Sequence, residues 1–154
     1  MRPRVYIDTS VIGGCEDEEF QEYSRRLLKE FQKGTKRAVV SDVTLLELEG
    51  APPPVRQILA ELPEGAVDYI GTSQEAFALA REYVREGVLS HNDFTDALHI
   101  AIATIERVDV LVSWNFRHIV NLERIRAFNA VNLKRGYPLL EIRSPREVLH
   151  EEEV

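Results

Sequence analysis

Short apolar runs rich in β-branched residues alternate along this chain with longer segments of helical period. Nearly continuous apolar strands are typical of a sheet buried on both faces, and a strand-then-helix order favours parallel strands joined by right-handed crossovers. The alternation predicts an α/β fold, a three-layer α/β/α sandwich with a central parallel sheet of about five strands. The expected strands cover residues 5–8, 38–41, 67–70, 110–113 and 139–143.

Helical segments lie between most of these runs. In the first segment, apolar side chains recur at spacings of three and four up to Gly34, which suits the C-terminus of a helix. Prolines 52–54 separate the second and third segments, because proline cannot continue a helix. The expected helices cover residues 20–34, 42–49, 55–62, 73–86 and 93–107.

Length and composition suit one globular domain. The chain has 154 residues, of which 44% are hydrophobic and 29% charged. We expect the domain to span residues 1–150, with the acidic residues 151–154 as a frayed tail. No apolar run approaches the roughly 18 residues of a membrane span, and no signal-peptide core follows the N-terminus, so we expect a cytoplasmic protein with no membrane partner.

Cysteine and charge limit the function further. Cys15 is the only cysteine, which excludes an intramolecular disulfide and a thiolate zinc cage, and without a histidine near it in sequence it is a poor candidate nucleophile. The net charge of −7 argues against a globally basic nucleic-acid binder. Two segments, 25–37 and 117–135, are nonetheless locally basic, and each could be a solvated face or a phosphate contact.

Three acids lie inside otherwise apolar stretches: Asp8, Glu47 and Asp96. An ionised carboxylate removed from water costs several kcal/mol unless a cation or hydrogen bonds compensate it. In open α/β sheets, ligands bind beyond the carboxyl ends of the strands, and Asp8 stands where the first strand ends. One metal ion at this edge would stabilise all three acids.

Several candidate site residues also have a structural explanation that stays open. Asp8 could cap a following helical turn, and Asp93 could simply favour the start of the helix that holds Asp96. Glu47 could lie exposed on an amphipathic helix. His99 could be a packing residue or could contact a carboxylate.

Taken together, the motifs resemble those of PIN domains, a family that includes the ribonuclease toxins (VapC-like) of toxin–antitoxin pairs. The similarity covers nearly the whole chain and rests on four motifs in the order of the family. They are Tyr-Ile-Asp-Thr-Ser-Val around Asp8, the helical Glu47, Asp-Ala-Leu-His-Ile-Ala-Ile-Ala from Asp96, and Leu-Val-Ser-Trp-Asn-Phe from Leu111.

The resemblance implies roles for individual residues. Asp8, Glu47 and Asp96 match the catalytic acids that hold Mg²⁺ or Mn²⁺, and Ser113 matches a hydroxyl residue that supports them. Asn115 departs from the commoner pattern, in which an aspartate supplies a fourth acid. The exchange removes one negative charge and should weaken the binding of a second metal ion.

Other residues near the motifs receive supporting roles. Asp93 could compensate for Asn115 as a metal ligand, and Thr9 follows the first acid. We expect Arg117 and His118 to bind substrate, because phosphates approaching an acidic pocket need cationic groups to position them. Of the aromatic pair Trp114 and Phe116, either could stack on bases, and at least one should belong to the core.

The resemblance implies a metal-dependent endoribonuclease that hydrolyses RNA phosphodiester bonds, and it makes the toxin of a toxin–antitoxin pair one role to expect. It also implies a homodimer and an antitoxin partner. An alternative is a catalytically weakened PIN-fold module that binds RNA or protein, as Asn115 suggests. A phosphatase with Asp8 as nucleophile fits less well, because the phosphatases with this motif carry a second aspartate where this chain has Ser10.

Overall fold

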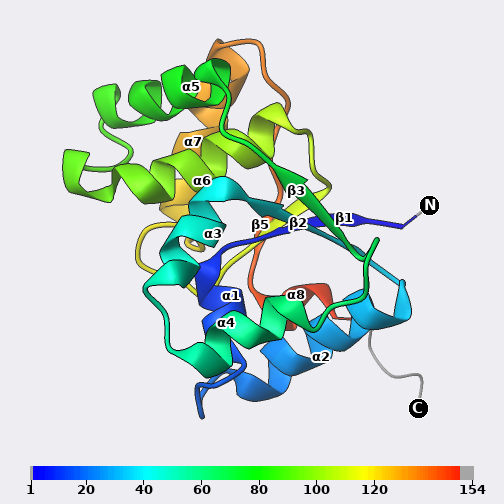
Figure 1. Cartoon of the computed structure of the whole chain (residues 1–154). Coiled ribbons are helices and arrows are strands. Elements are labelled where there is room, and N and C mark those ends of the chain that lie inside the picture. Colours follow the sequence, from blue (N-terminus) through cyan, green and yellow to red (C-terminus); the bar gives the residue numbers. More distant parts are fainter. Residues whose placement is uncertain (1, 150–154) are drawn as a thin grey trace.

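The computed structural model describes residues 2–149, which form a five-stranded sheet with helices on both faces (Figure 1). The strand order is β3-β2-β1-β4-β5, and all neighbouring pairs are parallel. This confirms the predicted fold class. The strands are β1 Arg4–Ile7, β2 Arg37–Ser41, β3 Val67–Ile70, β4 Val110–Val112 and β5 Ile142–Arg143. The tail expected at 151–154 lies outside the described residues, and the single-domain boundary stays a prediction.

The expected helices are all present, with ends shifted by a few residues. They are α2 Gln21–Lys33, α3 Asp42–Glu49, α4 Pro53–Ala60, α5 Gln74–Arg85 and α6 Phe94–Ile105, the last preceded by the 3₁₀ turn η1 His91–Asp93. Three further helices were not predicted: α1 Thr9–Gly14, α7 Leu122–Lys134 and α8 Pro145–Val148. The fifth strand is also shorter than expected, because residues 139–141 are not in strand conformation.

Side chains on alternate strand positions fill two separate cores, one on each face of the sheet. Tyr6, Val39 and Leu111 pack with α5, α6 and α7, whereas Val5 and Val40 pack with α1, α2 and α4. Figure 1 shows these two helical layers on opposite sides of the strands. The strands are buried on both faces, and this explains why they are continuously apolar.

The sheet brings the predicted acidic motifs to one edge. In register, Ile7 of β1 pairs with Val112 of β4, and β2 ends beside β1 at Ser41. The residues that follow, Asp8 and Ser113, therefore leave neighbouring strands at the same carboxyl edge. Within residues 2–149, no helix combines the length and apolar character needed to cross a membrane.

Candidate active site at the carboxyl edge of the sheet

Asp8 is buried directly after β1, with only 5% of its surface exposed. The hydroxyls of Ser10 and Ser113 donate to its two carboxylate oxygens, each at 2.6 Å, and the backbone N–H of Val11 donates to Oδ1 at 3.3 Å. The last of these bonds makes Asp8 the N-cap of α1, so the structural explanation is correct. The two serine bonds are additional to a cap and fix the carboxylate at the strand end.

Burial raises the pKa of the Asp8 carboxyl above its usual range. The nearby His99 ring and the hydrogen bonds from Ser10 and Ser113 oppose this rise without cancelling it. The charged form of Asp8 is thus only partly compensated by the protein. A cation at this edge would stabilise it further.

Glu47 projects from α3 toward Thr9 of α1 and His99 of α6, although 39% of its side chain remains exposed. Its Oε1 accepts a hydrogen bond from Thr9 at 2.9 Å and lies 2.7 Å from Nε2 of His99. Partial burial raises the pKa of Glu47, but the bond and charge of His99 and the bond from Thr9 outweigh it and leave the pKa below its usual value. Glu47 is therefore a fixed, ionised group rather than a free surface side chain.

His99 is 2% exposed and is hydrogen bonded through both ring nitrogens. Nε2 contacts Glu47, and Nδ1 lies 2.6 Å from the hydroxyl of Tyr6, which in turn lies 2.7 Å from Oγ of Ser41. Because an ionised Glu47 only accepts hydrogen bonds, Nε2 must carry a proton. Both explanations of His99 are correct: it is a buried packing residue and it contacts a carboxylate.

Asp96 lies in the first turn of α6 and faces His118 from the loop after β4. Nδ1 of His118 is 3.0 Å from Oδ2 of Asp96 and 3.6 Å from Oδ1 of Asp93. Burial raises the pKa of Asp96, and the hydrogen bond to His118 partly opposes this effect. Ser90 donates to the other oxygen of Asp93 at 2.7 Å. His118, expected to bind substrate, thus lies against the acids.

Asn115 joins the two halves of the site. Its side-chain Nδ2 lies 3.4 Å from Oδ2 of Asp96, and its Oδ1 accepts a hydrogen bond from the backbone N–H of His118 at 2.9 Å. Its own backbone N–H donates to Oγ of Ser113, the hydroxyl that holds Asp8. An aspartate in this position would place a second negative charge beside Asp96, whereas the amide can donate to it.

The site residues form neighbouring groups rather than one closed shell. Across residues 2–149, the one set of three acidic, histidine or cysteine side chains whose ligand atoms all lie within 4.8 Å of one another is Asp93, Asp96 and His118. Asp8 and Glu47 are outside this set. Asp8 is connected to it through the hydrogen bonds of Ser113 and Asn115, whereas Glu47 bonds to His99, which follows Asp96 by three residues on α6.

Trp114 and Phe116 follow Ser113 and have opposite environments. Trp114 is buried and stacks on Phe20 with ring centroids 4.3 Å apart, whereas Phe116 is 49% exposed. The expectation that at least one of the pair is core is confirmed. Arg117 is exposed immediately after Phe116, at the rim of the site.

Two bases of the first basic segment, Lys36 and Arg37, have structural partners. Lys36 is buried and forms an ion pair of 2.9 Å with Glu30, and Arg37 pairs with Asp68 at 2.5 Å. Burial also raises the pKa of the Cys15 thiol to about 11, so it is not a thiolate near neutral pH. Lys36, Arg37 and the cysteine therefore lie outside the site, and a phosphate contact by the other bases of the segment stays a prediction.

Comparison with known proteins finds matches among solved structures but not among sequences. No protein-family model matches the chain, and no curated protein sequence matches it significantly. VapBC2 from Rickettsia felis, solved bound to a DNA fragment from its promoter, matches with a TM-score of 0.56 at 17% identity, over 92% of this chain and 98% of that chain. VapC20 from Mycobacterium tuberculosis, a toxin that cleaves the sarcin–ricin loop, matches with a TM-score of 0.53 at 16% identity, over 89% of this chain and 98% of that chain. The chain therefore has the VapC-like PIN fold that its four motifs predict.

Proposed function

We propose that this protein is a divalent-metal-dependent endoribonuclease with Asp8, Glu47 and Asp96 as its catalytic acids. The observation that carries the proposal is the environment of Asp8. A structural cap needs only the bond from Val11, yet this carboxylate is buried and held at both oxygens by Ser10 and Ser113. Burial makes the ionised form of a carboxylate unfavourable. A protein that nevertheless fixes such a carboxylate is expected to use its charge to bind a ligand.

The residues present fit a divalent cation. Asp93, Asp96 and His118 offer two carboxylates and an imidazole within 4.8 Å of one another, and Asp8 and Glu47 would complete the set from the sheet and α3. Carboxylate oxygens suit Mg²⁺ and Mn²⁺, and an imidazole nitrogen shifts the preference toward Mn²⁺. When bound, such an ion supplies positive charge for phosphodiester hydrolysis.

The chain's own residues would position the acids and the substrate. Ser113 and Ser10 orient Asp8, and His99 with Thr9 orients Glu47, so each carboxylate is fixed before a substrate arrives. Arg117 and the exposed Phe116 stand at the rim of the site, where a guanidinium can contact a phosphate and a ring can stack on an unpaired base.

We extend the proposal to partners on the basis of the structural likeness. VapC20 is a toxin that cleaves the sarcin–ricin loop, and VapBC2 was solved on promoter DNA. We therefore propose that this protein acts on structured or single-stranded RNA as the toxin of a toxin–antitoxin pair, as a cytoplasmic homodimer with an antitoxin partner.

A second candidate function is a PIN-fold module that binds RNA or protein with weak catalysis. The observation in its favour is Asn115, whose side-chain oxygen already accepts a bond from His118. A site without a fourth acid holds less negative charge to attract metal. Titration of the protein with Mn²⁺ in a calorimeter separates the two candidates, because the nuclease should bind the ion stoichiometrically and Asp8→Asn should abolish that binding.

The nuclease proposal is tested by incubating a mixed RNA pool with the protein in Mn²⁺, in Mg²⁺ and in chelator. We expect cleavage with either ion, none in chelator, and a loss of at least about a hundredfold in Asp96→Asn. Asp17→Asn, an exposed aspartate outside the site, is the matched control and should keep full activity. Cleavage that survives both chelator and Asp96→Asn contradicts the proposal.

A further inference from the structure

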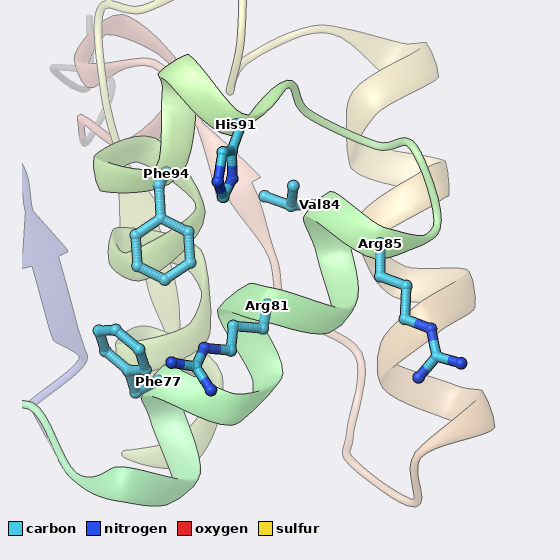
Figure 2. A pocket seen from close by; sticks show the side chains of 6 residues that line it. All are labelled: Phe77, Arg81, Val84, Arg85, His91 and Phe94. Carbon is cyan, nitrogen blue, oxygen red and sulfur yellow. The ribbon is translucent and has the colours of Figure 1, made fainter.

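A separate cavity of about 480 Å³ opens between α5 and the start of α6 (Figure 2). Its lining combines aromatic rings, cationic side chains and one aliphatic side chain, and none of the described residues that line it is acidic. This is unusual on a chain with a net charge of −7. The lining residues are Phe77, Arg81, Val84, Arg85, His91 and Phe94.

The aromatic and cationic groups of this cavity are arranged around one another. The rings of Phe77 and Phe94 meet edge to face with centroids 5.1 Å apart, and the guanidinium of Arg81 lies 4.8 Å from the centroid of Phe77. Figure 2 shows His91 on the α6 side beside Phe94 and Val84 opposite it, whereas Arg85 extends from the outer side of α5. Phe77 and Arg81 are both exposed, so a ligand can reach them from solvent.

The cavity adjoins the candidate active site along the chain. Phe94 directly follows Asp93, and neighbouring Cα atoms in a chain are about 3.8 Å apart. His91 stands two residues before the same aspartate, in the turn that leads into α6. A strand whose phosphate lies at a metal ion held by Asp93 and Asp96 would therefore have its next nucleotides within reach of the cavity.

The charge of the cavity favours an anionic occupant. Arg85 lies 3.6 Å from Glu82, whereas Arg81 forms no ion pair within residues 2–149, so the cavity holds one guanidinium that a phosphate could neutralise. Aromatic rings beside guanidinium groups suit a nucleic-acid strand, in which a flat base stacks and the adjoining phosphate is neutralised.

We propose that this cavity is a nucleobase subsite, which binds an unpaired base of the RNA beside the bond to be cut. Phe77 and Phe94 provide the apolar faces for the base, and Arg81 pairs with its phosphate. The subsite rests on the proposed nuclease function for its substrate, but base binding itself needs no metal ion.

The test measures the binding of a fluorescent single-stranded RNA in chelator, where cleavage cannot interfere. A second strand of equal length and charge, but with abasic positions, separates base binding from phosphate binding. We expect the protein to bind the base-bearing strand about tenfold more tightly, and Phe77→Leu, which keeps an apolar side chain, to remove that preference. Arg81→Gln should weaken binding of both strands.

Arg56→Gln is the matched control, because it removes the same charge from α4 on the other face of the sheet. Equal affinity of the parent protein for both strands would overturn the subsite. So would Phe77→Leu and Arg81→Gln variants that bind RNA as tightly as the parent does. Conversion of a dimer into a monomer by Phe77→Leu would also overturn it, since a second copy would then be the occupant. Cleavage in Mn²⁺ is measured in a separate assay. The subsite proposal can therefore be refuted while the nuclease proposal stands, and the nuclease proposal can be refuted while the subsite proposal stands.

Discussion

Nε2 of His99 lies 2.7 Å from Oε1 of Glu47 and thereby ties α6 to α3 across the carboxyl edge of the sheet. The same ring contacts Tyr6 of β1 through its other nitrogen. One buried imidazole therefore holds three elements together at the place where the acidic motifs converge.

Removing this imidazole should cost stability as well as activity. His99→Leu leaves the hydroxyl of Tyr6 and the carboxylate of Glu47 without their common partner, and we expect the free energy of unfolding to fall by about 1–3 kcal/mol. Urea denaturation measures the change. His91→Leu, at an exposed position, is the control and should leave the urea midpoint unchanged. An unchanged midpoint in His99→Leu would show that the hydrogen-bonded chain is not stabilising.

The two glycines of α1 should respond very differently to alanine. A Cβ at Gly14 would lie 2.5 Å from Oγ of Ser24 and 2.7 Å from Nε1 of Trp114, whereas a Cβ at Gly13 would meet nothing within 4 Å. We expect Gly14→Ala to destabilise the protein by about 1–3 kcal/mol through overpacking, and Gly13→Ala to be neutral or stabilising by up to about 1 kcal/mol. Thermal unfolding of the pair decides, and equal melting temperatures would refute the close packing around Gly14.

An acid at position 115 should make the metal-free protein less stable and the metal-bound protein more stable. In Asn115→Asp, the amide that lies 3.4 Å from Asp96 becomes a carboxylate, and we expect a loss of about 1 kcal/mol in chelator. In Mn²⁺ the added charge should raise affinity and so the melting temperature. Gln57→Glu on α4 adds the same charge elsewhere and should show neither change. A variant that melts like the parent in both buffers would contradict this.

Asp8 should make the metal-free protein less stable as pH rises. Its pKa is raised on folding, so the folded state holds more protons than the unfolded state above about pH 4, where unfolded aspartate titrates. Its contribution is then greatest below that pH and is lost as pH rises through the folded pKa. The pKa of aspartate in the unfolded chain is about 4. In chelator, the free energy of unfolding of Asp8→Asn should therefore rise relative to that of the parent between this pH and neutrality. Guanidinium unfolding at several pH values measures the difference, and a gain by the parent over this range would reverse the sign.

The motifs that could be predicted from the sequence are those with a local signature. Asp8 and Asp96 stand out because each interrupts an apolar run, and the strand-then-helix alternation was enough for the sheet. Helix α1 was missed because it has only six residues and ends in two glycines, so its period is too short to detect. The cap that starts it was recognised as an alternative role for Asp8.

The partners of the site residues could not be predicted, because they are distant in sequence. Tyr6 and His99 are 93 residues apart, and Asp96 and His118 are 22 residues apart, with most of α6 and all of β4 between them. Such pairs depend on the order of the strands in the sheet, and the spacing of residues along the chain does not reveal that order. The carboxyl-edge rule and the family resemblance linked the distant motifs in advance, but neither gives the hydrogen-bond partner of each side chain.

The position of β1 at the centre of the sheet has a consequence for the timing of activity. Asp8 is made early in synthesis, but the hydroxyl of Ser113 and the ring of His118 that accompany the acids come from the loop after β4. A nascent chain that has not yet added β4 beside β1 lacks both. The side chains around the acids therefore come together only after the loop that follows β4 has been synthesised.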